Sequence, residues 1–195
     1  MTTRCPATVL ERADAPVLAV GLAVGVALLV WIWPRSAPKA LGLTAAVLVL
    51  VMPLLILTQR TVGVGGPLPI SWGQRLDYWS YAIARIAEHP WRGWGLDASR
   101  TFSPHIQLHP HNAALQIWLE LGALGAVLAA LAWAFAFRRL ARDDRSLSTA
   151  AAAGSSAVYL LFGMVSFGVW QEWWLALAAL VAVIAALAET QPRTR

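Results

Sequence analysis

The chain has 195 residues, 58% of them hydrophobic and 13% charged, with a mean hydropathy of +0.60. This composition lies outside the range of soluble globular proteins and indicates a membrane protein. The basic residues behind the net charge of +5 form no patch with interleaved aromatic residues, which argues against nucleic acid as a partner, and a single cysteine, Cys5, excludes an intrachain disulfide and a zinc site of the cysteine type.

Five apolar runs follow one another along the chain, at 17–33, 40–57, 113–137, 150–170 and 173–188. A membrane-spanning helix needs roughly 20 apolar residues, so the middle three runs qualify outright and the outer two are short. The first run could instead be a signal peptide, although its length and its end at Trp31 and Trp33 favour a span. The pattern predicts an all-α polytopic transmembrane bundle, with two helices in residues 1–58 and three in residues 112–195.

The positions of lysine and arginine predict how the spans are oriented. These residues concentrate in three short segments, from Arg35 to Lys39, from Arg138 to Arg145, and at Arg193 and Arg195. Short basic loops stay on the cytoplasmic side of the membrane. With five spans all three segments lie on that side, so the loop of residues 59–111 and the turn near Gln171 are predicted to face outward, away from the cytoplasm.

The loop of residues 59–111 is too long for a simple connector, so it is either functional or disordered, and its pattern favours order. Apolar residues recur at spacings of four and three, which places them on one stripe of a helix. They are Trp72, Leu76, Trp79, Ile83 and Ile86. Pro90 ends this helix near Glu88. A short amphipathic helix is not stable alone, so we expect it to lie on the membrane surface or to pack against the spans.

Three arginines of the loop are candidates for binding phosphate. Arg75 lies on the flank of the apolar stripe, where it either snorkels towards water and headgroups or clamps a diphosphate with its rigid, bidentate guanidinium. Arg92 and Arg100 are further candidates for contact with phosphate or headgroups. Between them, Gly93 and Gly95 form either an ordinary tight turn or a turn whose backbone amides line a site.

Three histidines, His105, His109 and His111, lie near the end of the loop. Their spacing could suit a metal, but no cysteine or nearby carboxylate completes a recognised ligand set, so no metal is predicted. Each could also be an ordinary satisfied or solvent-exposed histidine. We favour a general base, because imidazole is largely neutral at periplasmic pH and can accept a proton from a hydroxyl. Asn112 is a candidate N-cap of the next span, and a helix start favours an anion.

Three residues of the third apolar run also stand out. Glu120 lies about two turns inside the run, where a carboxylate usually faces the bundle or a polar cavity. We expect it to be structural or network-forming first and catalytic second. Gly122 and Gly125 would let another helix approach closely.

The order of these features resembles the O-antigen ligase and O-antigen polymerase family. The resemblance covers about residues 74–137 and is carried by five short motifs. They are Arg75-x-x-x-Trp79, Glu88-His-Pro90, Gly93-x-Gly95, His109-x-His111-Asn112 and Glu120-x-Gly122-x-x-Gly125. Members of the family are integral membrane enzymes that transfer glycans from a polyprenyl diphosphate carrier. Their pattern places a histidine directly before asparagine, which implies that His111 rather than His109 is the base.

The resemblance implies a metal-independent, inverting glycosyltransferase that needs no cofactor and works at the outer face of the bacterial inner membrane. The donor would be a glycan linked to undecaprenyl diphosphate or a similar polyprenyl diphosphate. The acceptor would be lipid A-core or a growing polysaccharide, with membrane lipids around the protein. His111 would deprotonate the acceptor and Arg75 would hold the leaving diphosphate. The other candidates for substrate binding are Arg92, Arg100, His109 and Asn112.

The chain departs from the family in its number of spans. Members carry about twice as many, so the resemblance is to their C-terminal half, and an arginine that the family embeds in the membrane has no counterpart here. A second polypeptide could supply the missing half. The alternatives are a truncated remnant, a non-catalytic scaffold, and a transporter or channel. The last would need more polar residues along the spans than Glu120, Ser155, Ser156 and Ser166.

Overall fold

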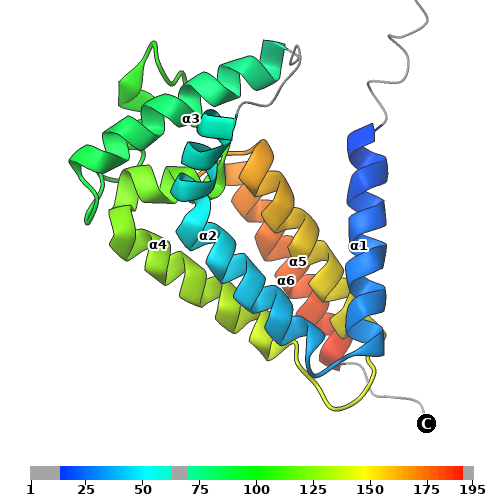
Figure 1. Ribbon diagram of the computed structural model, residues 1–195. Helices are drawn as coiled ribbons and strands as arrows, with labels where there is room; N and C mark the ends of the chain where they lie inside the picture. Colours follow the sequence, from blue (N-terminus) through cyan, green and yellow to red (C-terminus); the bar gives the residue numbers. More distant parts are fainter. Residues whose placement is uncertain (1–13, 63–69, 191–195) are drawn as a thin grey trace, which may run out of the picture.

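The computed structural model of the protein describes residues 14–62 and 70–190, and every regular element within them is a helix (Figure 1). In chain order the elements are α1 (Asp14–Ile32), α2 (Ala37–Val62), α3 (Ile70–Glu88), the short 3-10 helix η2 (Ala98–Phe102), α4 (Ala113–Arg139), α5 (Leu147–Val165) and α6 (Glu172–Thr190). This confirms the all-α fold class. Cys5, Arg193 and Arg195 lie outside the described residues.

Four of these helices are long and apolar enough to cross a membrane, namely α1, α2, α4 and α5. They support an integral membrane protein. The fifth predicted span coincides with α6, but its apolar stretch within the described residues, Glu172–Val183, is shorter than the roughly 20 residues that a span needs. The fifth span therefore stays a prediction. The helix α2 also continues to Val62, beyond the boundary predicted at residue 58.

The spanning helices form two closely packed pairs, α2 with α4 and α1 with α5, which run side by side in Figure 1. Small residues allow both contacts. A Cβ added to Gly42 of α2 would lie 3.0 Å from the carbonyl oxygen of Ala134, and one added to Gly154 of α5 would lie 2.5 Å from that of Ala23. Close backbone approach through small residues is the usual way in which helices associate in membranes.

A hydrogen bond between α2 and α4 compensates for Pro53, which lies inside α2. Proline has no N–H to donate to the carbonyl four residues earlier, which here belongs to Val49. The indole Nε1–H of Trp118 in α4 donates to this Val49 oxygen at 2.9 Å. Because a backbone group freed inside a membrane needs another partner, Trp118 both satisfies α2 and ties it to α4.

The two basic connections lie together at one end of the bundle. The backbone N–H of Arg142 donates to the carbonyl of Pro34 at 3.1 Å, and Arg35 forms an exposed ion pair with Asp143 at 2.6 Å. The hydrogen bond and charge of Arg35 lower the pKa of Asp143. The charge pattern assigns both connections to one side of the membrane, and the fold places α3 at the opposite end of the bundle (Figure 1).

The helix α3 packs against the spans, one of the two arrangements that its amphipathic pattern allows. Its apolar stripe joins residues of α4 and of the following loop in one buried cluster. The cluster contains Ile56, Trp79, Ala82, Ile86, Ile106, Leu115 and Leu119. The indole of Trp79 also donates to the carbonyl oxygen of Pro110 at 2.7 Å. This bond holds α3 against the segment that carries His109 and His111.

The helix α4 is broken near the end that faces α3. Gly122 has φ 64° and ψ −161°, a conformation that is essentially restricted to glycine. The break frees backbone groups, and the loop after α3 binds them. The N–H groups of Trp94 and Gly95 donate to carbonyls of α4 at 3.0 and 2.9 Å, and the N–H of Ala123 donates to the carbonyl of Pro90 at 2.8 Å. These backbone groups of the irregular segment are thus satisfied by another part of the protein.

Candidate functional site

Three segments meet beside α3 at this end of the bundle: the start of α4, the loop of residues 97–111 and the turn of residues 166–171 between α5 and α6. Apart from Thr149 at the start of α5, the buried polar side chains in the described part of the chain all lie here. They are Ser99, His109, Asn112, Gln116 and Glu120. Since a buried polar group is costly unless it is hydrogen-bonded, the partners of these side chains define the site.

His111 is held from two sides. Its Nδ1 lies 2.8 Å from the carbonyl oxygen of Ser166. Because a carbonyl can only accept, Nδ1 carries the proton in this bond, and Nε2 of the neutral ring keeps its lone pair. The ring of Tyr78 in α3 stacks against His111 at 6.2 Å between centroids and 13° between planes. The result is an oriented imidazole whose Nε2 can accept a proton.

His109 is buried next to His111, with 4.3 Å between the ring centroids. Its Nδ1 accepts the backbone N–H of His111 at 3.2 Å, and its Nε2 lies 3.3 Å from the side-chain nitrogen of Gln171. Burial, followed by the charges of His111 and Arg100, lowers the pKa of His109 to about 4. His109 is therefore neutral at physiological pH. A Cβ on Gly168 would lie 2.8 Å from its ring, so glycine there leaves room for the histidine.

Asn112 begins α4 as its predicted N-cap. Its backbone is extended, and its side-chain oxygen accepts the N–H of Leu115 at 2.9 Å. The cap satisfies one of the free amides of the first turn. It also fixes the backbone that directly follows His111.

Arg75 lies on α3, one helical turn before Tyr78, so the Cβ atoms of these two residues are about 5–6 Å apart. Tyr78 stacks on His111, so Arg75 lies on the same helix as a residue that contacts the imidazole. The Arg75 guanidinium lies over the ring of Trp72, 5.1 Å from its centroid. The snorkelling and the phosphate-binding interpretations of Arg75 both stay predictions.

The other two predicted phosphate ligands lie on different elements. Arg100 is in η2, where it pairs with Asp97 at 2.8 Å and contributes to the field around His109. Arg92 is exposed in the loop after α3, and within the described residues its side chain forms no ion pair or hydrogen bond. The fold thus leaves Arg92 and Arg100 on the surface.

Glu120 is fully buried and accepts hydrogen bonds from three parts of the chain. Its Oε1 accepts from the Ser99 hydroxyl at 2.6 Å and from the side-chain amide of Gln116 at 3.0 Å. Its Oε2 accepts from the backbone N–H of Asp97 at 2.9 Å and from the indole N–H of Trp170. The carboxylate therefore connects the loop, α4 and the turn between α5 and α6.

Two glycines allow the loop after α3 to reach the break in α4. A Cβ on Gly93 would lie 2.4 Å from the carbonyl carbon of Glu120, and a Cβ on Gly122 would lie 2.5 Å from that of Trp91. The sequence predicted that another helix approaches Gly122, but the approaching segment is a loop. The break in α4 leaves backbone groups unpaired, and this irregular segment forms hydrogen bonds with them.

For Gly93 and Gly95 the backbone hydrogen bonds favour the tight turn, one of the two predicted alternatives. The amides of Gly93 and Gly95 donate to the carbonyls of His89 and Glu120, so they are occupied rather than free to line a site. A Cβ added to Gly125 would lie 2.1 Å from the Cβ of Leu121, which belongs to the same helix. The close contact at Gly125 is therefore within α4, whereas the sequence predicted the approach of another helix.

His105 is separate from the other two histidines of the loop. It stacks on Tyr81, with 4.5 Å between centroids. Within residues 14–62 and 70–190, no three side chains of His, Cys, Asp or Glu are placed to hold a metal ion.

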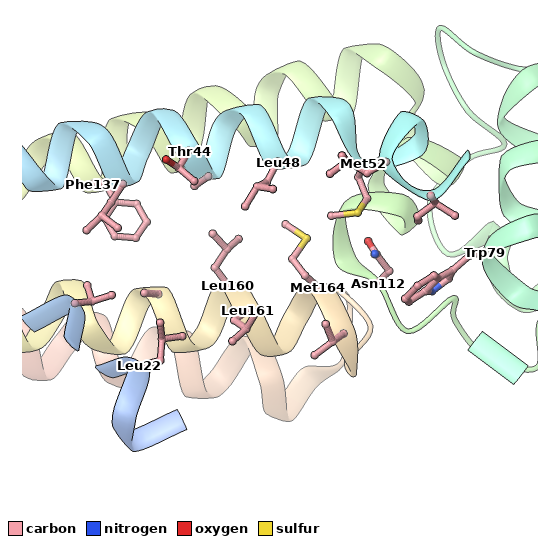
Figure 2. Close-up of a pocket in the computed structure, with 17 residues that line it drawn as sticks. Leu22, Thr44, Leu48, Met52, Trp79, Asn112, Phe137, Leu160, Leu161 and Met164 are labelled. Carbon is pink, nitrogen blue, oxygen red and sulfur yellow. The ribbon is translucent and has the colours of Figure 1, made fainter. Parts of the chain in front are cut away.

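An apolar groove of about 500 Å³ leads to the site from the middle of the bundle (Figure 2). Figure 2 shows Thr44, Leu48 and Met52 on α2, across from Leu160 and Met164 on α5, with Phe137 at one end of the groove and Trp79 and Asn112 at the other. The lining is almost entirely apolar. The groove therefore ends beside the residue that follows His111.

Several residues of this site were not identified as such from the sequence. They are Tyr78, Ser99, Gln116, Ser166, Trp170 and Gln171. Gln116 had a usable signal, since it lies four residues before Glu120 and so shares a helix face with it inside an apolar run. Ser166 acts through its backbone carbonyl, which no side-chain pattern can reveal.

Comparison with known proteins identifies the family. A sequence profile described as O-Antigen ligase matches residues 7–130, more than half of the chain. Two similar proteins, each named "Putative polysaccharide ligase", come from Rickettsia felis, 30% identical over 129 residues, and Rickettsia bellii, 29% identical over 130 residues. Each match covers 58% of this chain and 31% of the relative, so the chain spans about a third of the length of the curated relatives it matches. No solved structure is significantly similar. The chain belongs to the O-antigen ligase family.

Proposed function

We propose that this chain carries the transfer site of a polysaccharide-ligase-type glycosyltransferase. The family and the names of its relatives suggest the reaction class. The supporting observation is His111, an imidazole with an oriented Nε2, whose chain neighbour Asn112 lines the end of an apolar groove. A base beside a lipid-sized groove suits a reaction in which a lipid-linked glycan meets a hydroxyl.

The proposed donor is a glycan linked to polyprenyl diphosphate. Its isoprenoid chain would lie in the apolar groove, whose lining extends along α2 from Leu41 to Ile56, about 22 Å of helix. The diphosphate would then lie near α3, where Arg75 offers a bidentate, permanently charged guanidinium. The N-terminus of α4 adds a favourable dipole for an anion at the same place.

The proposed reaction is a single displacement with inversion. The acceptor hydroxyl oxygen attacks the anomeric carbon, and the bond between that carbon and the diphosphate oxygen breaks. The hydroxyl proton passes to Nε2 of His111, while Nδ1–H remains bound to the Ser166 carbonyl. Arg75 stabilises the charge on the departing polyprenyl diphosphate, so the scheme requires neither a nucleotide nor a metal ion. A base positioned in this way contributes about 10²–10⁴ in rate.

We place the site at the outer face of the bacterial inner membrane, with lipid A-core or a growing polysaccharide as the acceptor. The basic connections at the opposite end of the bundle support this orientation. A cysteine at the exposed position Ser103, in a Cys5-free background, should react with a membrane-impermeant thiol reagent in intact cells. Labelling only after lysis would reverse the orientation. Because the chain spans about a third of its relatives, we assign the activity to the complete family fold, with further helices or a second polypeptide.

The base is tested by substitution in membrane vesicles that contain the complete protein and a polyprenyl diphosphate-linked donor. His111→Ala should reduce transfer by at least about 10² while protein level and donor binding are retained. The matched control is His105→Ala, because His105 is exposed and stacks on Tyr81 away from the site. Full transfer by His111→Ala would remove the catalytic role and favour a non-catalytic scaffold.

A further inference from the structure

The side chain of Gln116 is almost completely buried and is hydrogen-bonded at both ends. Its amide nitrogen donates to Oε1 of Glu120 at 3.0 Å, and its amide oxygen accepts the backbone N–H of Val169 at 2.9 Å. A carboxylate requires a donor and a backbone N–H requires an acceptor. Glutamine meets both requirements at once, whereas glutamate and methionine of similar size do not.

These bonds connect α4 to the turn that contacts both histidines. Gln116 holds Val169, and Glu120 holds the next residue, Trp170, through its indole N–H. The same turn contains Ser166, whose carbonyl accepts the Nδ1–H of His111 at 2.8 Å. Two side chains that lie one turn apart on α4 therefore fix the segment that fixes the imidazole.

We propose that Gln116 is a positioning residue for His111. By anchoring Val169 it keeps the Ser166 carbonyl in place, and that carbonyl holds the proton of the neutral imidazole on Nδ1. The lone pair is then on Nε2. In the proposed function this atom takes the proton of the acceptor hydroxyl, and the kinetic part of this inference rests on that proposed function. Without the anchor the turn shifts and the imidazole populates both neutral tautomers.

Nitrogen-15 NMR of histidine-labelled protein in phospholipid nanodiscs tests this directly, at about pH 8.5, where a free imidazole is neutral. The His111 signals are assigned from their loss in His111→Gln. Wild-type protein should show the proton on Nδ1, and Gln116→Met, which keeps the size but removes both hydrogen bonds, should show a mixture of tautomers. The matched control is Gln107→Met, a substitution of an exposed glutamine that should leave the wild-type spectrum unchanged.

Transfer kinetics in the complete protein provide the second measurement. Gln116→Met should lower kcat by up to about 10²-fold, the lower end of what a positioned base contributes, with little change in KM for the donor. An unchanged Nδ1–H tautomer in folded Gln116→Met would overturn the positioning role. A tautomer mixture with unchanged kcat would instead overturn His111 as the base, so failure of this inference and failure of the proposed function are distinguishable.

A variant that leaves α4 intact covers the case in which Gln116→Met does not fold. Trp170→Phe keeps an aromatic ring in the turn but removes the N–H that donates to Glu120. It should produce a smaller population of the second tautomer and a smaller loss of kcat. The matched control is Trp31→Phe in α1, a partly exposed position far from the turn in the sequence, which should change neither quantity. A wild-type tautomer in folded Trp170→Phe would show that the turn does not depend on this network.

Discussion

Two regions of this bundle are stabilised by different kinds of interaction. At the end near α3, buried polar groups such as Glu120 and Gln116 are joined by directional hydrogen bonds. In the spanning part, α1 packs on α5 and α2 on α4 through apolar side chains and close contacts at Gly154 and Gly42. Apolar packing tolerates substitutions that conserve volume, whereas a polar network depends on every donor and acceptor. The polar end can therefore hold a functional group in one geometry, and the spanning part supplies its support.

The strongest test of this difference is at the break in α4. Gly122→Ala places a Cβ 2.5 Å from the backbone of Trp91 at φ +64°. Backbone strain alone costs about 1–3 kcal/mol, and the clash must also displace the loop after α3. We expect Gly122→Ala to lower the free energy of unfolding by more than about 3 kcal/mol. Thermal unfolding in detergent measures the change.

Gly25→Ala is the matched control, because Gly25 lies in α1 with no atom within 4 Å of an added Cβ. Alanine is a better helix former than glycine by up to about 1 kcal/mol, so this variant should be as stable as the wild type or more so. Equal stability of the Gly122→Ala and Gly25→Ala variants would show that the loop does not occupy the break.

A smaller effect is expected from overpacking in the spanning part. In Gly154→Ala the new Cβ would lie 2.5 Å from the carbonyl oxygen of Ala23, at a helical position without backbone strain. The helices α1 and α5 can separate slightly to accommodate it, at a cost of about 1–3 kcal/mol. Gly163→Ala, whose Cβ would meet its nearest neighbour at 3.5 Å, should be close to neutral. If Gly154→Ala unfolds at the wild-type temperature, the close α1–α5 contact is wrong.

The last expected effect is a pH dependence that arises at the polar end. The pKa of His109 falls from 6.5 to about 4 on folding, so the unfolded chain binds a proton at a higher pH than the folded one. Stability from this group is fully present above about pH 6.5 and is lost as the pH falls towards 4. His109→Asn should flatten the stability profile in this range, and His105→Asn should retain the wild-type slope. Parallel profiles for all three proteins would exclude His109 as the cause.

The sequence predicts the elements of this fold better than it predicts their irregularities. The apolar runs locate the spanning helices, Pro90 ends α3, and Asn112 caps α4, because each of these features depends on local composition and periodicity. The break at Gly122 is different. Glycine inside an apolar run is equally compatible with close helix packing, and only the loop that binds the freed backbone groups distinguishes the two.

In the candidate site, too, the sequence predicts some features and not others. His111 is recognisable from its neighbours in the sequence, but its orientation depends on the carbonyl of Ser166, 55 residues away. A backbone acceptor has no residue signature, so no motif could reveal it. Glu120 was expected to form a network, and its geometry agrees with that interpretation, but its partners come from segments whose pairing only the tertiary fold determines.

The contact between Pro53 and Trp118 has a consequence for how this family can vary. The indole donates to the carbonyl that proline leaves without its helical partner, so the two residues form one unit although they lie on different helices. In a relative with another residue at the position of Pro53, the backbone N–H of that residue would donate to the carbonyl at the position of Val49. That carbonyl would then not require the indole as a donor. We therefore expect proline and tryptophan to be gained and lost together at these two positions when an alignment of relatives is compared.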